Sequence, residues 1–309
     1  MNTPIVEFFK KYILNIKTIS IFTAISIPVF LVFLFDKGLG AGILTIAFLT
    51  VITFLFFRFF KQKNKEIYFV FLIFILIHLA AVLFIYYAKF QPFSGGSDAD
   101  GYNGTAIQVA ERLSYGNFSV AGIPRVNNFP ILIGVIYFLT VPTMLVGQLF
   151  MVWLAAVSLS LVYFIILEIG GPKKSAVLIS IILSFYPSYL LFGSLLLKDN
   201  LVTPLLLAGI LLSVKMLKNF GTWKNLIWKF LLFFVILGGL MHLRFYMGFA
   251  LMFSFIISWF VASNFERNKK IIYGLAMMFL LGFSPQIIGS GYYGQNLFKN
   301  FLNKESITN

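Results

Sequence analysis

The sequence predicts an all-α integral membrane protein, a polytopic bundle of about nine membrane-spanning helices. Of its 309 residues, 60% are hydrophobic and only 11% are charged, a balance that a soluble globule cannot accommodate. Nearly uncharged windows of about 18 residues or more recur, and this length lets an α-helix cross roughly 30 Å of hydrocarbon. A β-barrel would show short alternating strands instead. Because no cysteine is present, disulfides and thiolate chemistry are excluded.

The chain is predicted to form a single transmembrane domain over residues 1–309 that begins with a surface helix. In residues 1–18, apolar side chains recur at helical spacing and Lys10, Lys11 and Lys17 occupy the other face, which is typical of an amphipathic helix lying on a membrane. Nine spans are then predicted, at about 19–35, 41–57, 67–88, 149–167, 175–196, 201–216, 230–241, 247–262 and 271–288.

Residues 129–140 are apolar but too few to span a bilayer, so we expect an interfacial or re-entrant helix there. With this segment left out of the count, most of the 24 Lys and Arg residues fall on one side of the membrane. The positive-inside rule makes that side cytoplasmic. The N-terminus is then cytoplasmic, while a large loop over 89–147 and the tail over 289–309 are exterior. The formal charge of +14 therefore reflects topology, and nucleic acid is not an expected partner.

The exterior loop carries the first candidate site, at Asp98 and Asp100. These acids lie two residues apart at the start of a predicted helix whose apolar stripe begins at Tyr102. One carboxylate could accept a proton from an attacking hydroxyl, or both could hold Mg²⁺ or Mn²⁺. The start of a helix also favours an anionic ligand. The alternative interpretation is a solvated turn rich in Asp and Gly.

The second group of candidates consists of basic residues on the exterior side. Lys198 could bind a phosphate as a point charge, with Asp199 fixing its position. Arg244 can bind two phosphate oxygens at once, and Tyr246 can donate a hydrogen bond beside it. Arg125 is a further candidate for anion binding. For Lys198, the alternative is a side chain that merely extends to the headgroup level.

Two histidines and one proline complete the set of singled-out residues. His242 is interpreted as a hydrogen-bonded residue beside Arg244, and His78 as a hydrogen-bond partner between helices rather than a proton relay. Pro187 lies inside the predicted span 175–196 and is expected to kink it, because proline lacks the amide N–H of a helix interior.

The pattern Asp98-x-x-x-Tyr102-x-x-x-Ala106, in a first large exterior loop followed by a proline-headed apolar helix, resembles the GT-C glycosyltransferases. The similarity covers roughly residues 90–250 and includes YPSYLLFGSLLLKDN and HLRFY. The resemblance implies a multi-span transferase, similar to protein and lipid A sugar transferases. Such enzymes take a sugar from a polyprenyl-phosphate donor and pass it to a lipid, glycan or protein acceptor in a bacterial inner or plasma membrane.

By the same resemblance, Asp98 would be the general base or a metal ligand with Asp100 as its neighbour. Lys198 and Arg244 would stabilise the departing lipid phosphate. Two alternatives stay open: a polysaccharide polymerase or ligase that uses outward-facing arginines, and a lipid or solute transporter. None of the predicted spans carries a charged residue near its middle, which disfavours a transporter.

Overall fold

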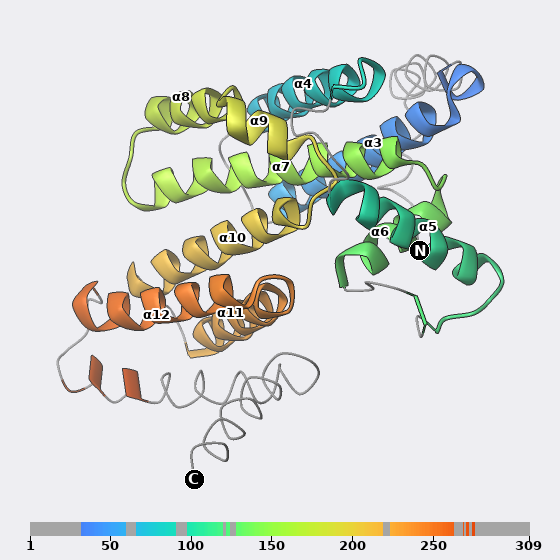
Figure 1. The fold of residues 1–309 in the computed structure, drawn as a ribbon. Coiled ribbons are helices and arrows are strands. Elements are labelled where there is room, and N and C mark those ends of the chain that lie inside the picture. The colour runs from blue at the N-terminus through green and yellow to red at the C-terminus, as the bar shows by residue number, and fades with distance from the viewer. Residues whose placement is uncertain are drawn as a thin grey trace, which may run out of the picture. The chain divides into compact units, whose positions relative to one another are not determined.

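The computed structural model describes residues 32–59, 66–90, 98–119, 122–123, 128–218, 223–262, 268, 270–271 and 274–275 (Figure 1). These residues are 87% helical and contain no strand, which confirms the predicted all-α class. The helices are α3 (Lys37–Phe59), α4 (Glu66–Tyr87), α5 (Asp98–Ser114), α6 (Asn128–Leu139), α7 (Met144–Glu168), α8 (Lys173–Ser184), α9 (Pro187–Gly193), α10 (Asp199–Lys218), α11 (Trp223–Leu243) and α12 (Phe245–Ala262). The predicted surface helix, most of the first and last predicted spans and the predicted tail lie outside the described residues.

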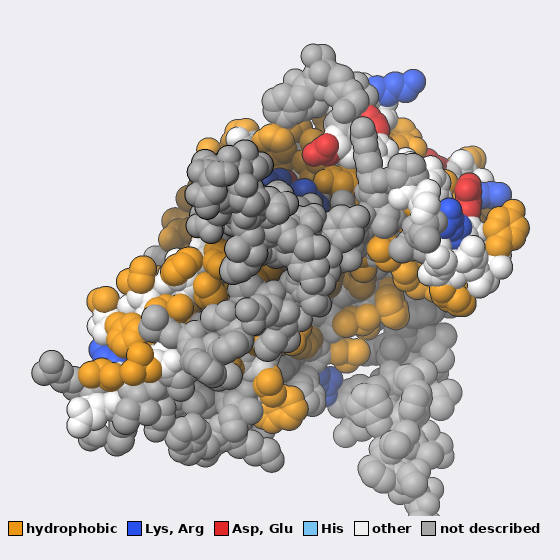
Figure 2. Space-filling model, turned by 60° about the horizontal axis from the view of Figure 1, so that its bottom comes forward, with side chains coloured by type: hydrophobic (Ala, Val, Ile, Leu, Met, Phe, Trp, Pro, Cys, Tyr) orange, Lys and Arg blue, Asp and Glu red, His pale blue; other side chains and the backbone are white. Residues whose placement is uncertain are grey.

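Four of the described helices, α3, α4, α7 and α10, are long and apolar enough to cross a membrane, and the bent pair α8 and α9 brings the number to as many as five. Helices α11 and α12 are apolar but shorter over their hydrophobic parts. Large apolar side chains are exposed on the long helices, for example Phe48 and Leu55 on α3 and Phe69 on α4. Hydrophobic side chains, drawn in orange, also make up much of the described surface visible in Figure 2. Exposed apolar side chains on long helices are compatible with an integral membrane protein, in which they contact lipid.

The predicted kink at Pro187 is confirmed, and it divides the predicted span 175–196 into two helices. Helix α8 ends at Ser184, α9 begins at Pro187, and the two axes are bent by 67°. A proline at the first helical position lacks an N–H that would in any case have no partner in the helix, so it starts a helix better than it continues one.

The chain divides into two compact units, each of which is described by itself. The first comprises Met1–Lys63, Val82–Trp153 and Ser194–Leu196, and the second comprises Asn64–Ala81, Leu154–Gly193 and Leu197–Asn309. Among the described helices, the first unit contains α3, α5 and α6, and the second contains α8 to α12.

In the first unit, α5 and α6 pack closely as a helical pair. The buried face of α5 is made of small residues, among them Ala106, Val109 and Ala110. Gly134 of α6 lies against this face: a Cβ atom added there would be 2.6 Å from the Val109 Cβ and 2.9 Å from the Ala106 carbonyl oxygen. Because α6 has only 12 residues, it is too short to span a bilayer alone, in agreement with the interfacial or re-entrant helix expected over 129–140.

We expect the substitution Gly134→Ala to separate α5 from α6 and to lower the free energy of unfolding by about 1–3 kcal/mol, the usual cost of overpacking. The matched control is Gly104→Ala on α5, where an added Cβ would meet nothing within 4 Å. This control should be neutral or stabilising by up to about 1 kcal/mol, since alanine favours helix. Thermal unfolding in detergent micelles measures both. Equal midpoints for the two variants would contradict the close approach.

In the second unit, α10, α11 and α12 share a core of large apolar side chains. Its fully or nearly fully buried members include Phe233 and Leu237 of α11 and Phe255 and Trp259 of α12. The rings of Phe233 and Phe255 lie with their centroids 4.8 Å apart. This core holds the start of α10 near the connection between α11 and α12, and so positions the site described below.

His78 of α4 also lies in the second unit, and its predicted hydrogen bond to another helix is absent from the described residues. The side chain is completely buried, and neither ring nitrogen has a hydrogen-bond partner there. The ring instead meets Tyr189 edge-on, with centroids 5.5 Å apart, and lies close to Gly193. Because Gly193 has no side chain, the His78 ring has room to pack, and its contact with Tyr189 is aromatic rather than polar.

Candidate functional site

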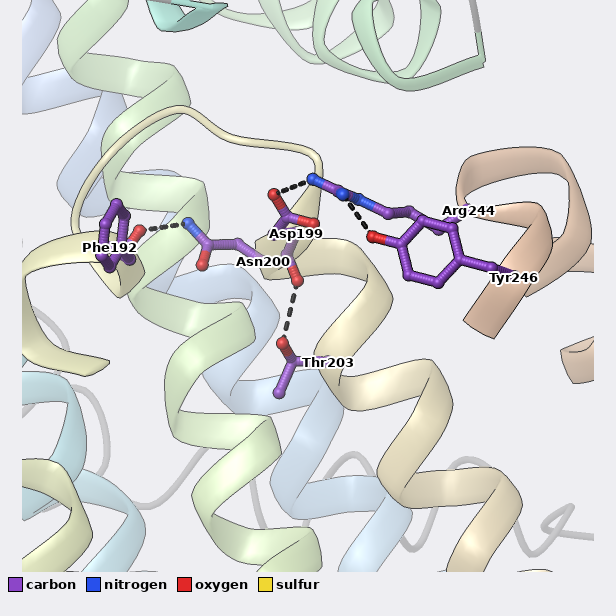
Figure 3. A network of polar contacts seen from close by, with 6 residues as sticks. All are labelled: Phe192, Asp199, Asn200, Thr203, Arg244 and Tyr246. Carbon is purple, nitrogen blue, oxygen red and sulfur yellow. Dashed lines mark hydrogen bonds and ion pairs between the residues drawn. The ribbon is translucent and has the colours of Figure 1, made fainter. Parts of the chain in front are cut away.

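The strongest polar cluster in the second unit lies around Arg244, in the connection between α11 and α12 (Figure 3). The Arg244 amide donates to the Leu240 carbonyl at 2.7 Å, and the Arg244 carbonyl accepts from the Met247 amide at 3.0 Å. Arg244 thus closes one helix and opens the next. Because Leu240 is fully buried in the core, the backbone that carries the guanidinium is anchored.

The guanidinium joins two other side chains. Its Nη2 donates to Asp199 Oδ2 at 2.6 Å in an ion pair, and its Nη1 donates to the Tyr246 hydroxyl. The Arg244 Cζ lies 5.7 Å from the centroid of the Tyr246 ring. The Arg244 side chain is 29% exposed and that of Asp199 is 48% exposed, so the ion pair is partly open to solvent. Its net contribution to stability is therefore small, about 1 kcal/mol or less.

The electrostatics keep Arg244 charged. Burial alone would lower its pKa, but the hydrogen bonds with Tyr246 and Asp199 outweigh burial and raise the pKa above the ordinary arginine value. A raised pKa stabilises the folded state below the unfolded value, and this contribution is lost only at far more alkaline pH. The guanidinium is therefore cationic throughout the physiological range.

Two hydrogen-bond donors around Arg244 have no acceptor among the described residues. The Arg244 Nε–H is buried and has no hydrogen-bond partner among the described residues. Because the Tyr246 hydroxyl accepts from Arg244, its own proton is left for another acceptor. An oxyanion could accept the Tyr246 proton, and a buried N–H without a partner, such as that of Arg244, is uncommon enough in folded proteins to suggest a functional role.

The start of α10 is held by its own polar side chains. The Thr203 hydroxyl donates to the Asp199 carbonyl at 2.9 Å, and Asn200 Nδ2 donates to the Phe192 carbonyl at 2.9 Å (Figure 3). The second bond ties α10 to α9, just beyond the break at Pro187. The carboxylate of Asp199 is thereby presented to Arg244 from a fixed backbone.

The predicted pairing of Asp199 with Lys198 is wrong, because Asp199 pairs with Arg244 instead. Adjacent residues at a helix start point in different directions, whereas the packing of α10 on α11 and α12 brings Arg244 to the carboxylate. Lys198 is half-buried, and its ammonium has no partner among the described residues. His242 is exposed, and its Nδ1 lies 3.0 Å from the Gly238 carbonyl of its own helix, as interpreted from the sequence.

The acidic pair lies in the first unit, where Asp98 and Asp100 occupy the first turn of α5 as predicted. Both side chains are exposed and make no hydrogen bond or ion pair with a described residue. Ala99 between them is buried. Each carboxylate is therefore available to a substrate hydroxyl.

Asp98 and Asp100 are also the predicted ligands of a possible Mg²⁺ or Mn²⁺ ion. Residues two apart on an α-helix are separated by about 200° around its axis and do not face each other. Within the part of the chain that the structure describes, no group of three or more His, Asp or Glu could hold a metal ion. A metal ion held by Asp98 and Asp100 would therefore need further ligands from substrate or water, and this metal site stays a prediction.

Tyr102, Asp36 and Arg125 are not part of either candidate site as the structure describes them. Tyr102 packs edge-on against Phe129, with centroids 5.1 Å apart, and so joins α5 to α6. Asp36 accepts from the Tyr87 hydroxyl at 2.6 Å and from the Leu39 amide at 3.0 Å, and these bonds lower its pKa. It is therefore a helix cap. Arg125 lies outside the described residues.

Comparisons with protein-family models, curated proteins and solved structures find no match to this chain.

Proposed function

We propose that the chain is a membrane glycosyltransferase similar to the GT-C enzymes, which moves a sugar from a polyprenyl-phosphate donor to a lipid, glycan or protein acceptor. The observation that carries this proposal is the Arg244 guanidinium, held between Asp199 and Tyr246 at the end of apolar helices with an N–H donor left over. A phosphate attached to a membrane lipid lies at the level where such helices end. A fixed cation there stabilises the charge that develops on it.

In the proposed reaction, the oxygen of an acceptor hydroxyl bonds to the anomeric carbon of the sugar. The bond from that carbon to the phosphate oxygen breaks, its electron pair stays on the phosphate, and polyprenyl phosphate leaves. Asp98 receives the hydroxyl proton, since its carboxylate is exposed and has no hydrogen-bond partner among the described residues. Arg244, Lys198 and Tyr246 stabilise the departing phosphate, and attack opposite the leaving group inverts the anomeric centre. These steps use side chains alone.

The proposal includes nine spans in a bacterial inner or plasma membrane, with a cytoplasmic N-terminus and an exterior C-terminus. The natural chain has no cysteine, so single cysteines report topology directly. We expect Glu111→Cys on α5 to react with a membrane-impermeant maleimide in intact cells. Lys173→Cys on α8 should react only after the membrane is opened. The native Glu111 and Lys173 side chains are both exposed, so the maleimide should reach either cysteine once the membrane is opened. The reverse pattern would contradict the proposed orientation.

The direct test uses the full chain reconstituted in liposomes with a polyprenyl-phosphate-linked sugar and candidate acceptors. We expect polyprenyl phosphate to be released in step with the glycosylated acceptor. Loss of this activity on addition of a chelator would assign Asp98 and Asp100 to a metal ion, whereas an unchanged rate would leave Asp98 as a metal-free base. Movement of the intact donor across the bilayer without its consumption would replace the transferase with the transporter alternative.

A further inference from the structure

A second candidate site in the second unit lies between the first residues of α4 and α8. A cavity of about 320 Å³ is lined there by Glu66 of α4 and by Lys173, Lys174, Val177, Leu178 and Ile181 of α8. This volume is at the lower end of the range for small-molecule sites. We call it the α4–α8 cavity. None of its lining residues belongs to the candidate site around Arg244.

The cavity changes from charged to apolar along α8. Lys174, Val177, Leu178 and Ile181 are three, four and seven residues apart, so they share one face of the helix. The lysines lie in the first turn, and the apolar residues follow toward the middle of the helix. Such an order matches a lipid, whose polar head lies at the end of a helix and whose acyl chains follow its apolar face.

The charged side chains at the mouth have no polar partner within the described part of the chain. Glu66, Lys173 and Lys174 are all exposed, and none forms an ion pair or hydrogen bond with another described residue. Pro172 is the N-cap of α8, and its side chain accepts no hydrogen bond from the first-turn N–H groups. The mouth thus offers two ammonium groups and helix N–H donors beside one carboxylate.

We propose that the α4–α8 cavity binds a phospholipid whose head carries a phosphate and a primary ammonium group, as in phosphatidylethanolamine. The phosphate pairs with Lys173 and Lys174, and the lipid ammonium donates to Glu66. The acyl chain lies along Val177, Leu178 and Ile181. A choline head has no N–H to donate to Glu66, and a glycerol head has no positive charge for it. This inference is independent of the proposed transferase activity.

The test is a titration of the purified full-length chain in detergent with ethanolamine, choline and glycerol phospholipids of identical acyl chains, with binding read by native mass spectrometry. We expect the ethanolamine lipid to bind most tightly. The double variant Lys173→Gln with Lys174→Gln should lose about 30-fold in affinity for it, since each of the two lysines near a lipid surface contributes about 1 kcal/mol. Glu66→Gln should erase the preference for ethanolamine over choline.

The control is Lys215→Gln, which removes one exposed lysine from the end of α10, outside the cavity, and should leave all three affinities unchanged. Three outcomes would overturn the proposal: equal binding of the ethanolamine and choline lipids by the natural chain, tighter binding of the glycerol lipid, or unchanged affinity in the double lysine variant. All substituted side chains are exposed, so folding is not at risk.

Discussion

Asp98→Asn is expected to lower the rate of sugar transfer about 10²- to 10⁴-fold, the usual contribution of a general base. The amide keeps the size and hydrogen-bonding ability of the carboxylate but cannot take up a proton at neutral pH. Because the Asp98 side chain is exposed and has no partner among the described residues, the variant should fold normally. The expected change in the free energy of unfolding is about 1 kcal/mol or less, from the lost charge at the start of α5.

Asp100→Asn is the matched control for this prediction. It removes the same charge from the same turn of α5, at a position about 200° around the helix axis. If Asp98 is the base, the Asp100 variant keeps most of its activity, and thermal unfolding of the two variants is alike. Full activity of the Asp98 variant would remove the proposed base. Equal inactivation by both substitutions would point to the combined negative charge of the turn instead.

Arg244→Gln is expected to lower transfer about 10²- to 10³-fold, as does removal of one preorganised group that stabilises developing charge. The loss should appear mainly in kcat, because the guanidinium is needed most when negative charge grows on the departing phosphate. Arg244→Lys keeps the charge but not the planar fork of donors, so it should recover only part of the activity. The turnover of a defined polyprenyl-phosphate sugar should be measured for the natural chain, Arg244→Gln and Arg244→Lys.

The variant Asp199→Asn distinguishes a catalytic role of Arg244 from a purely structural one. Both Arg244→Gln and Asp199→Asn break the ion pair, which is partly exposed and contributes about 1 kcal/mol or less to stability. If Arg244 acts on the phosphate, Asp199→Asn loosens the guanidinium but leaves its charge in place, so it should lower activity less than Arg244→Gln does. Equal losses of activity in the two variants would show that the ion pair matters only for holding α10 to the α11–α12 connection.

Local features of the chain were predictable because they depend on near neighbours in sequence. The apolar runs predicted α3, α4, α7 and α10 as helices of membrane-spanning length, and the short run at 129–140 predicted α6. Pro187 predicted the break between α8 and α9. The spacing after Asp98 predicted a helix that begins at the acids, since a helix start favours acidic side chains.

By itself, then, the sequence predicted the helical class, the long apolar helices and the acidic and basic candidate residues. Only the tertiary structure decided which of those charges meet. Asp199 pairs with Arg244, 45 positions away, rather than with its neighbour Lys198. His78 packs on Tyr189 instead of donating to another helix, and Asp36 caps α3 through Tyr87 and Leu39. The physical reason is that helix periodicity is a local property, whereas the partner of a polar side chain depends on how apolar faces distant in sequence interlock.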